Sequence, residues 1–151
     1  MLAHKASEEG MAVAEIIATG HGHIERDVIP WIIYTDPEIA WVGLTELSLK
    51  QTERPYSIGF FPFAATGRAK AHGKTEGFIK ILSDKATDQI LGIHMIGSHI
   101  SELIGESVLA MKSGITATDL SKTIHAHPTL SEAIHEAALA THGRAIHITN
   151  R

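Results

Sequence analysis

Cysteine is absent from all 151 residues of this chain. Without a thiol, the chain can form no disulfide, no thiolate metal site and no cysteine nucleophile. A glycine-rich dinucleotide fingerprint is missing as well, because Gly20-His-Gly22 is the nearest approach and lacks the third glycine of Gly-x-Gly-x-x-Gly. The sequence therefore supplies neither a redox pair of cysteines nor a nucleotide-binding loop.

Strong charge and long apolar runs are also missing. The net charge of -4 gives no basic excess for binding nucleic acid or an anionic membrane. No apolar run reaches the ~20 residues that a helix needs to cross a bilayer. The residues from Met1 to Lys5 lack the basic-then-apolar layout of a secretory signal. We therefore expect a cytoplasmic protein that binds neither nucleic acid nor membrane.

The residues that are present have the composition of a globular domain, with 44% hydrophobic and 20% charged residues. A helix is expected over residues 2–19, ended by Gly20, and a linker without periodicity follows over residues 21–28. Beyond it, β patterns come first and helical patterns follow. Strands are expected at 31–34, 39–42, 56–61, 77–82 and 89–96, and helices at 45–51, 98–114, 117–124 and 131–142. The expected fold is α+β, an antiparallel sheet of about five strands with helices packed on one face, preceded by one helix.

One histidine among the 11 in the chain stands in a setting suited to acid–base chemistry. His127 is followed by Pro128, which restricts the backbone, and Glu132 lies five residues later at the start of an expected helix. A carboxylate bonded to one imidazole nitrogen fixes the tautomer and raises the basicity of the other nitrogen. The spacing is therefore that of a general base and its orienting carboxylate.

A plainer interpretation fits the same residues. Thr129 and Glu132 have the spacing of a capping box, which would stabilise the helix by about 1 kcal/mol and do nothing else. Spacing alone leaves both interpretations open. His125 has the same neighbourhood but no following proline, so we interpret it as structural.

The remaining features indicate no metal site, and they do not settle which surface would bind a partner. His21 and His23 lie in the linker, and neither they nor His142 and His147 form the His-x-x-x-His pair with a carboxylate that marks zinc sites. The basic stretch 67–72 is expected to be a solvated loop. A small apolar set lies in the last expected helix and in the turn before it, at Ile134, Ala138 and Ala126. These residues could either form an exposed patch for a dimer or pack within the monomer.

The segment from His125 to Ala133, His-Ala-His-Pro-Thr-Leu-Ser-Glu-Ala, closely resembles the C-terminal signature of dihydrolipoyl dehydrogenases. Further segments resemble the same family in the same order along nearly the whole chain. They are 2–6 (Leu-Ala-His-Lys-Ala), 34–43 (Tyr-Thr-Asp-Pro-Glu-Ile-Ala-Trp-Val-Gly), 61–65, 67–69, 75–80, 90–94, 101–104 and 136–138.

The resemblance implies specific roles for two residues. His127 would be the acid–base residue and Glu132 would orient it. In a homodimer this pair would reach the partner subunit's flavin and redox disulfide, and there take a proton from a dihydrolipoyl thiol. FAD and NAD would belong to the full-length enzyme, with none bound to this chain, which alone would be inactive.

The resemblance also implies a division of the chain and a set of partners. Residues 1–20 would be the terminal helix of the FAD-binding part, and residues 29–151 would form the dimerisation domain. Residues 21–28 would be the linker between the two. The helix start, Met1, Leu2, Ala3 and His4, would lie near the flavin. Partners would be the lipoyl domain and acyltransferase core of a 2-oxo-acid dehydrogenase complex, or the glycine cleavage system.

Two alternatives remain. The chain could be a purely structural dimerisation or partner-docking module, because the cofactor machinery is missing. It could instead be the interface domain of a reductase for glutathione or mercuric ion. The sequence of residues 125–133 favours the dihydrolipoyl enzyme.

Overall fold

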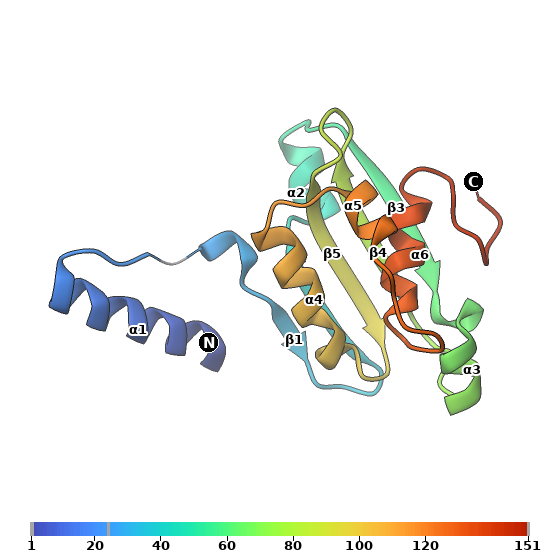
Figure 1. The fold of residues 1–151 in the computed structure, drawn as a ribbon, viewed down its shortest axis with the longest axis horizontal. Helices are drawn as coiled ribbons and strands as arrows, with labels where there is room; N and C mark the ends of the chain where they lie inside the picture. Colours follow the sequence, from blue (N-terminus) through green and yellow to red (C-terminus); the bar gives the residue numbers. More distant parts are fainter. Residues whose placement is uncertain (1, 24, 151) are drawn as a thin grey trace.

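The fold is built on a five-stranded antiparallel sheet in the order β1-β2-β5-β4-β3 (Figure 1). The computed structural model describes residues 2–23 and 25–150. The strands are β1 (Trp31–Ile33), β2 (Glu38–Gly43), β3 (Tyr56–Pro62), β4 (Phe78–Asp84) and β5 (Ile90–Gly97). The expected α+β fold is confirmed, with strand ends that differ from expectation by one or two residues.

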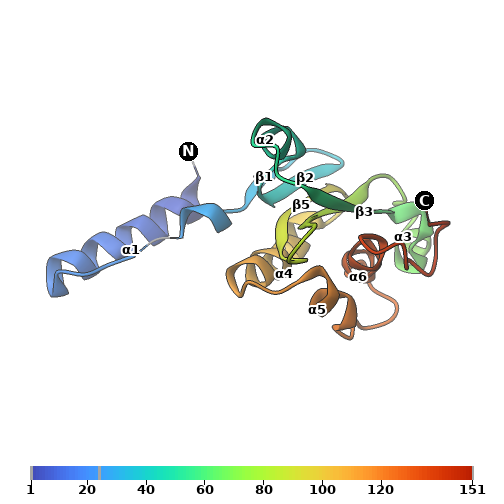
Figure 2. The ribbon, with the colours of Figure 1, turned by 90° about the horizontal axis from the view of Figure 1, so that it is seen from above.

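Helices cover the two faces of the sheet unequally. The three helices α4 (Ile100–Lys112), α5 (Ala117–Lys122) and α6 (Glu132–Ala140) lie on one face, whereas α2 (Glu46–Gln51) lies on the other (Figure 2). Thr45 caps α2 through a capping box with Ser48. On this second face, Leu49 of α2 packs with Leu82 and Leu91 of the sheet.

The basic stretch 67–72 forms a helix, α3 (Gly67–His72), so the expectation of a solvated loop was wrong. A 3-10 turn over Phe63–Ala65 leads into it, and Gly73 ends it in the left-handed conformation (φ 67°). The helix forms because Ala69 is fully buried and anchors one side of the stretch to the core. A second 3-10 turn, Arg26–Val28, lies in the expected linker.

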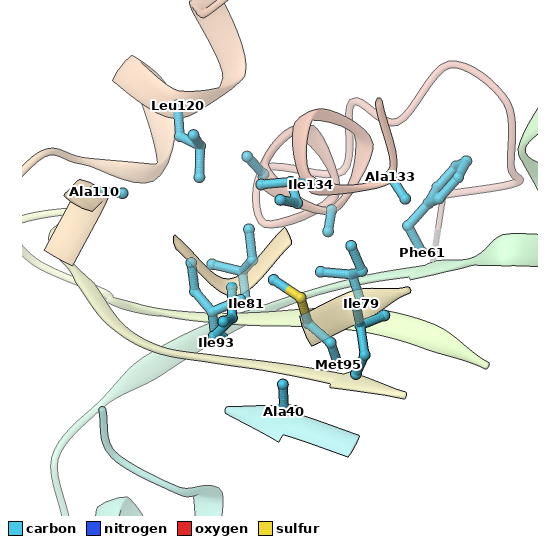
Figure 3. Packing of buried hydrophobic residues seen from close by; sticks show 14 of the residues in the cluster. Ala40, Phe61, Ile79, Ile81, Ile93, Met95, Ala110, Leu120, Ala133 and Ile134 are labelled. Carbon is cyan, nitrogen blue, oxygen red and sulfur yellow. The ribbon is translucent and has the colours of Figure 1, made fainter. Parts of the chain in front are cut away.

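The main core lies between the sheet and helices α4 to α6. Because side chains alternate along a strand, Ile79, Ile81, Ile93 and Met95 all point to this face, where Ile134 of α6 meets them (Figure 3). Burying each such side chain contributes about 1.5–3 kcal/mol. Ile134 and Ala138 are both fully buried, so these two residues pack within the monomer, whereas Ala126 in the preceding turn is exposed.

Helix α6 lies unusually close to strand β3. A Cβ atom at Gly59 would lie 1.9 Å from the backbone oxygen of Ala137, so only glycine permits this approach. The close contact fixes the height of α6 above the sheet. It thereby fixes the position of Glu132, the first residue of α6.

Helix α1 (Ala3–Thr19) stands apart from the sheet (Figures 1 and 2). Gly20 ends it with φ of 80°, as the sequence predicts. The start of α1 contacts the segment just before β1, where the Nε2 atom of His4 lies 2.8 Å from the backbone oxygen of Pro30. Large apolar side chains remain exposed on α1, among them Met11, Val13 and Ile17. No helix in the described residues is both long and apolar enough to cross a membrane.

Candidate functional site

His127 and Glu132 are brought together at the entry to α6. The Nδ1 atom of His127 lies 2.8 Å from Oε1 of Glu132. An ionised carboxylate only accepts hydrogen bonds, so Nδ1 carries the proton and Nε2 keeps its lone pair. The side chain of His127 is 78% exposed, which leaves that nitrogen available to a group from outside the domain. This is the geometry of an oriented general base.

The same carboxylate also holds the turn that precedes α6. Oε2 of Glu132 accepts a hydrogen bond of 2.8 Å from the backbone N–H of Thr129. The hydroxyl of Thr129 donates to the backbone oxygen of Ala126 at 2.7 Å, and the N-cap residue of α6 is Ser131, which makes no side-chain cap hydrogen bond, so the capping box does not form. The capping-box interpretation was therefore wrong, and Glu132 instead joins the His127 ring to the turn before α6. The His127–Pro128 peptide bond within this turn is cis.

Glu132 is held in its ionised form. Partial burial raises its pKa, but hydrogen bonds from Thr129 and His127, together with the charges of His127 and His147, outweigh this effect. The pKa of Glu132 therefore lies below its usual value of 4.5. An ionised partner is what stabilises an imidazolium when His127 takes up a proton.

The pair opens onto a cavity of about 360 Å³. Its walls come from the turn before α6, from one side of α6, from the end of β3 with the following residues, and from the C-terminal segment. Apolar side chains such as Phe61 and Ile146 line it beside the titratable groups. The hydroxyl of Thr66 and Nδ1 of His135 are buried in this region without a hydrogen-bond partner among the described residues.

A second imidazole–carboxylate pair lines the same cavity. Nδ1 of His147 lies 2.6 Å from Oε1 of Glu136, and Oε2 of Glu136 accepts the backbone N–H of Ile146 at 2.8 Å. This pair was not among the residues expected from the sequence. The one available signal was the four-residue spacing of Glu132 and Glu136, which places both carboxylates on one side of α6.

His125 is enclosed in the cavity wall, with a side chain only 6% exposed. Its Nε2 lies 2.7 Å from Oε1 of Glu106 on α4, and its Nδ1 lies 2.9 Å from the backbone oxygen of Thr123. The hydrogen bond to Glu106 raises the pKa of His125 above its usual 6.5; burial opposes this, and the charges of Glu106 and Glu132 and the Thr123 carbonyl add to it. Its position agrees with our structural interpretation of this residue.

The residues expected near a flavin lie far from this pair. Met1 falls outside the described residues, and Leu2, Ala3 and His4 lie at the start of α1, on the opposite side of the molecule from α6 (Figures 1 and 2). The structure therefore does not bring these residues together with His127.

Other histidines are dispersed. His142 pairs with Asp88 at 3.2 Å, and His21 contacts the backbone oxygen of Thr19. Among residues 2–23 and 25–150, no three His, Asp or Glu side chains converge in a way that could hold a metal ion.

Comparison with known proteins identifies a family and close relatives. The family model of the pyridine nucleotide-disulphide oxidoreductase dimerisation domain matches residues 29–138. The chain is 52% identical over 147 residues to dihydrolipoamide dehydrogenase of Chaetomium thermophilum, covering 97% of this chain and 29% of that protein. It is 51% identical to the mitochondrial dihydrolipoyl dehydrogenase of Dictyostelium discoideum, covering 98% and 30% of the two chains. A bacterial dihydrolipoyl dehydrogenase, from Cupriavidus necator, is 49% identical and covers 98% and 31%.

Solved structures agree with these sequence relatives. LpdA from Mycobacterium tuberculosis superposes with a TM-score of 0.76 at 30% identity, covering 83% of this chain and 28% of that chain. The flavoprotein disulfide reductase RclA from Escherichia coli gives a TM-score of 0.78 at 23% identity over 85% of this chain and 30% of its own, which shows the shared fold alone. This chain spans about 30% of the length of the curated relatives that it matches. It belongs to the family of pyridine nucleotide-disulphide oxidoreductase dimerisation domains.

Proposed function

We propose that this chain is the dimerisation domain of a flavin-dependent, NAD-linked dihydrolipoyl dehydrogenase and supplies the acid–base pair His127 and Glu132 to the partner subunit. The observation that carries the proposal is the pair itself. Nδ1 of His127 is bonded to Glu132 at 2.8 Å, and the ring is 78% exposed with Nε2 free to act outward. The relatives named dihydrolipoyl dehydrogenase support the choice of substrate.

The proposed chemistry needs such a base. A thiol of pKa ~8.5 is a poor nucleophile until it loses its proton. Nε2 of His127 takes that proton from a dihydrolipoyl thiol, and Glu132 stabilises the imidazolium that forms. The resulting thiolate attacks one sulfur of the partner subunit's disulfide, forming a mixed disulfide and releasing the other sulfur as a thiolate. A positioned base typically contributes ~10²–10⁴-fold to the rate.

FAD and NAD are assigned to the rest of the proposed enzyme. This sequence contains no glycine-rich phosphate loop, so its residues do not fit a site that would hold a dinucleotide. The start of α1, from Leu2 to His4, lies near the flavin of its own subunit in this proposal. The separation of α1 from α6 supports a dimer in which each half of a site comes from a different subunit (Figure 1). The division into 1–20, 21–28 and 29–151 belongs to the same proposal.

The proposed partners follow from the substrate. A dihydrolipoyl group is carried on a lipoyl domain, so a lipoyl domain and the acyltransferase core of a 2-oxo-acid complex, or the glycine cleavage system, would deliver it. The relatives include mitochondrial and bacterial proteins, and the cytoplasmic location expected from the sequence stays a prediction.

The test is His127→Gln in a full-length enzyme that carries this chain as its dimerisation domain. We expect kcat/KM for dihydrolipoamide oxidation to fall by about 10²–10⁴-fold, while FAD stays bound and the dimer stays intact. His72→Gln is the matched control, because His72 is an exposed histidine of α3 and lies outside the cavity. Near-normal oxidation by His127→Gln would contradict the proposal. Glutathione disulfide and mercuric ion, assayed in parallel, test the alternative substrates.

The structural-module alternative is favoured by one observation, the lack of cysteine and of a nucleotide loop in this chain. It predicts a dimer of the 151-residue chain by itself. Sedimentation at roughly 100 μM tests this, and a monomer there would argue against an autonomous dimerisation module.

A further inference from the structure

His125 makes an unusual pair of contacts for a buried histidine. Both ring nitrogens have a hydrogen-bond partner, Glu106 Oε1 at 2.7 Å from Nε2 and the Thr123 backbone oxygen at 2.9 Å from Nδ1. A carbonyl oxygen only accepts hydrogen bonds, and so does an ionised carboxylate. A neutral imidazole has one N–H and one lone pair, so it would turn a lone pair toward one of these oxygens. The imidazolium is the ring form that donates to both.

We propose that His125 is held as an imidazolium between Glu106 and Thr123, and that this buried cation is a positioning residue that clamps the turn bearing His127 to helix α4. Glu106 belongs to α4, which packs on the sheet, and it is 19 residues away in sequence from His125. The contact therefore ties the turn to a rigid part of the fold. The consequence for catalysis rests on the function proposed above for His127.

The charges around His125 favour this state. Glu106 faces it from α4, and Glu132 adds negative charge from α6. His135 of α6 packs against the ring, with centroids 5.4 Å apart and planes inclined by 53°. Lys122 at the end of α5 is the nearby cation of the cavity wall. Two carboxylates therefore face the imidazolium, and the raised pKa of His125 agrees with the geometry.

The turn is tied down on both sides of His127. After it, Thr129 bonds to Ala126 and to Glu132. Before His127, the contact of His125 with Glu106 holds the turn against α4. When His125 loses a proton at alkaline pH, one of its two contacts becomes a lone pair facing an oxygen, and the tie weakens. His127 then keeps Glu132 as its partner, but the turn that aims the pair is released.

The protonation state is measured directly by NMR of the 151-residue chain with ¹⁵N-labelled histidine, titrated from acid to alkaline pH. At pH 7.5, where an exposed histidine is neutral, both nitrogens of His125 are expected to carry protons. Glu106→Gln is expected to lower the titration midpoint of His125 by roughly one pH unit or more. Glu102→Gln is the control, because it removes the same charge one turn earlier on α4 from an exposed residue. A His125 signal with a single protonated nitrogen at pH 7.5, or equal shifts from both variants, would overturn the proposal.

The positioning role is measured in the full-length enzyme. Glu106→Gln is expected to lower kcat/KM for dihydrolipoamide oxidation by about 10-fold on the alkaline side, more than at pH 6, with partial recovery in Glu106→Asp. A Glu106→Gln profile that matches Glu102→Gln would overturn the positioning role while leaving the role of His127 intact. An active His127→Gln variant would instead remove the proposed function, and the NMR titration would still decide the state of His125.

Discussion

The Nδ1 atom of His127 lies 2.8 Å from one oxygen of Glu132, while the other oxygen of Glu132 holds the backbone N–H of Thr129 at 2.8 Å. One carboxylate thus orients the ring and closes the turn that carries the ring. Orientation of the base and the start of α6 are therefore coupled. A substitution at Glu132 should affect both activity and stability, and the two effects can be separated by the choice of residue.

Glu132→Gln should separate orientation from charge. The amide oxygen can still accept from Nδ1 of His127, but the side chain no longer stabilises an imidazolium by its charge, and its NH2 group cannot accept from the Thr129 N–H. We expect kcat/KM of the full-length enzyme to fall by about 10–100-fold, less than for His127→Gln. Glu132→Ala should lose more activity and also about 1 kcal/mol of stability, because the backbone N–H of Thr129 loses its acceptor. Equal activity of Glu132→Gln and wild type would contradict the assigned role.

The pH dependence of stability should reveal the ionised state of Glu132. Its pKa is lowered in the folded chain, so the folded state binds fewer protons than the unfolded state near pH 4. The stabilisation is therefore fully present above the unfolded value of about 4.5 and is lost as pH falls through the lower folded value. Urea unfolding of wild type and Glu132→Gln between pH 3 and 7, a range that spans this carboxyl transition, checks this. A difference in unfolding free energy that stays constant with pH would contradict it.

Glu136 should hold the C-terminal segment on the cavity wall. Its side chain is 5% exposed and accepts from the amides of Ile146 and His147 and from the His147 ring. Glu136→Ala should destabilise the chain by about 1–3 kcal/mol, because the hydrogen bonds that its buried carboxylate accepts are lost. Amide hydrogen exchange should accelerate at Ile146 and much less at Ile79 in the core. Unchanged exchange at Ile146 would show that the segment is held by other contacts.

Gly59→Ala should disrupt the approach of α6 to β3. The added Cβ would lie 1.9 Å from the backbone oxygen of Ala137, so the helix must move. We expect a loss of about 1–3 kcal/mol of stability. We also expect a weaker contact between His127 and Glu132, because Glu132 is the first residue of α6. Gly105→Ala is the control, because this helical glycine has open space around its Cβ position and should gain about 0.5–1 kcal/mol. A neutral Gly59→Ala would refute the close packing.

His94 should remain neutral into acid solution. It lies on the sheet face opposite the main core, and both of its ring nitrogens are buried without a partner among the described residues. Burial and the charge of Lys80 lower its pKa to about 4, with Glu46 opposing. The unfolded state binds the proton first, so stability should fall as pH drops from 6.5 to about 4. His94→Leu should remove this slope, and NMR titration of His94 near pH 6.5 would contradict it.

Local patterns were enough for the strands, for most helices and for the His127–Glu132 spacing. Two β-type runs, residues 77–82 and 89–96, on either side of a polar turn segment predicted β4 and β5, and glycine predicted the end of α1. These features depend on neighbours a few residues apart, which the sequence displays directly. The short helix α3 was missed because its stability comes from the burial of Ala69 and not from a periodic face of its own.

The sequence by itself determined that a carboxylate lies within reach of His127, because only five positions separate Glu132 from His127 along the chain. Only the tertiary structure decided that Glu132 bonds both to the His127 ring and to the Thr129 amide, that Ile134 and Ala138 are core and not surface, and that His125 meets Glu106 from another helix. The pairs His125–Glu106 and His147–Glu136 join residues 19 and 11 positions apart. Such contacts depend on how α4, α6 and the C-terminal segment pack, and no local spacing encodes that packing.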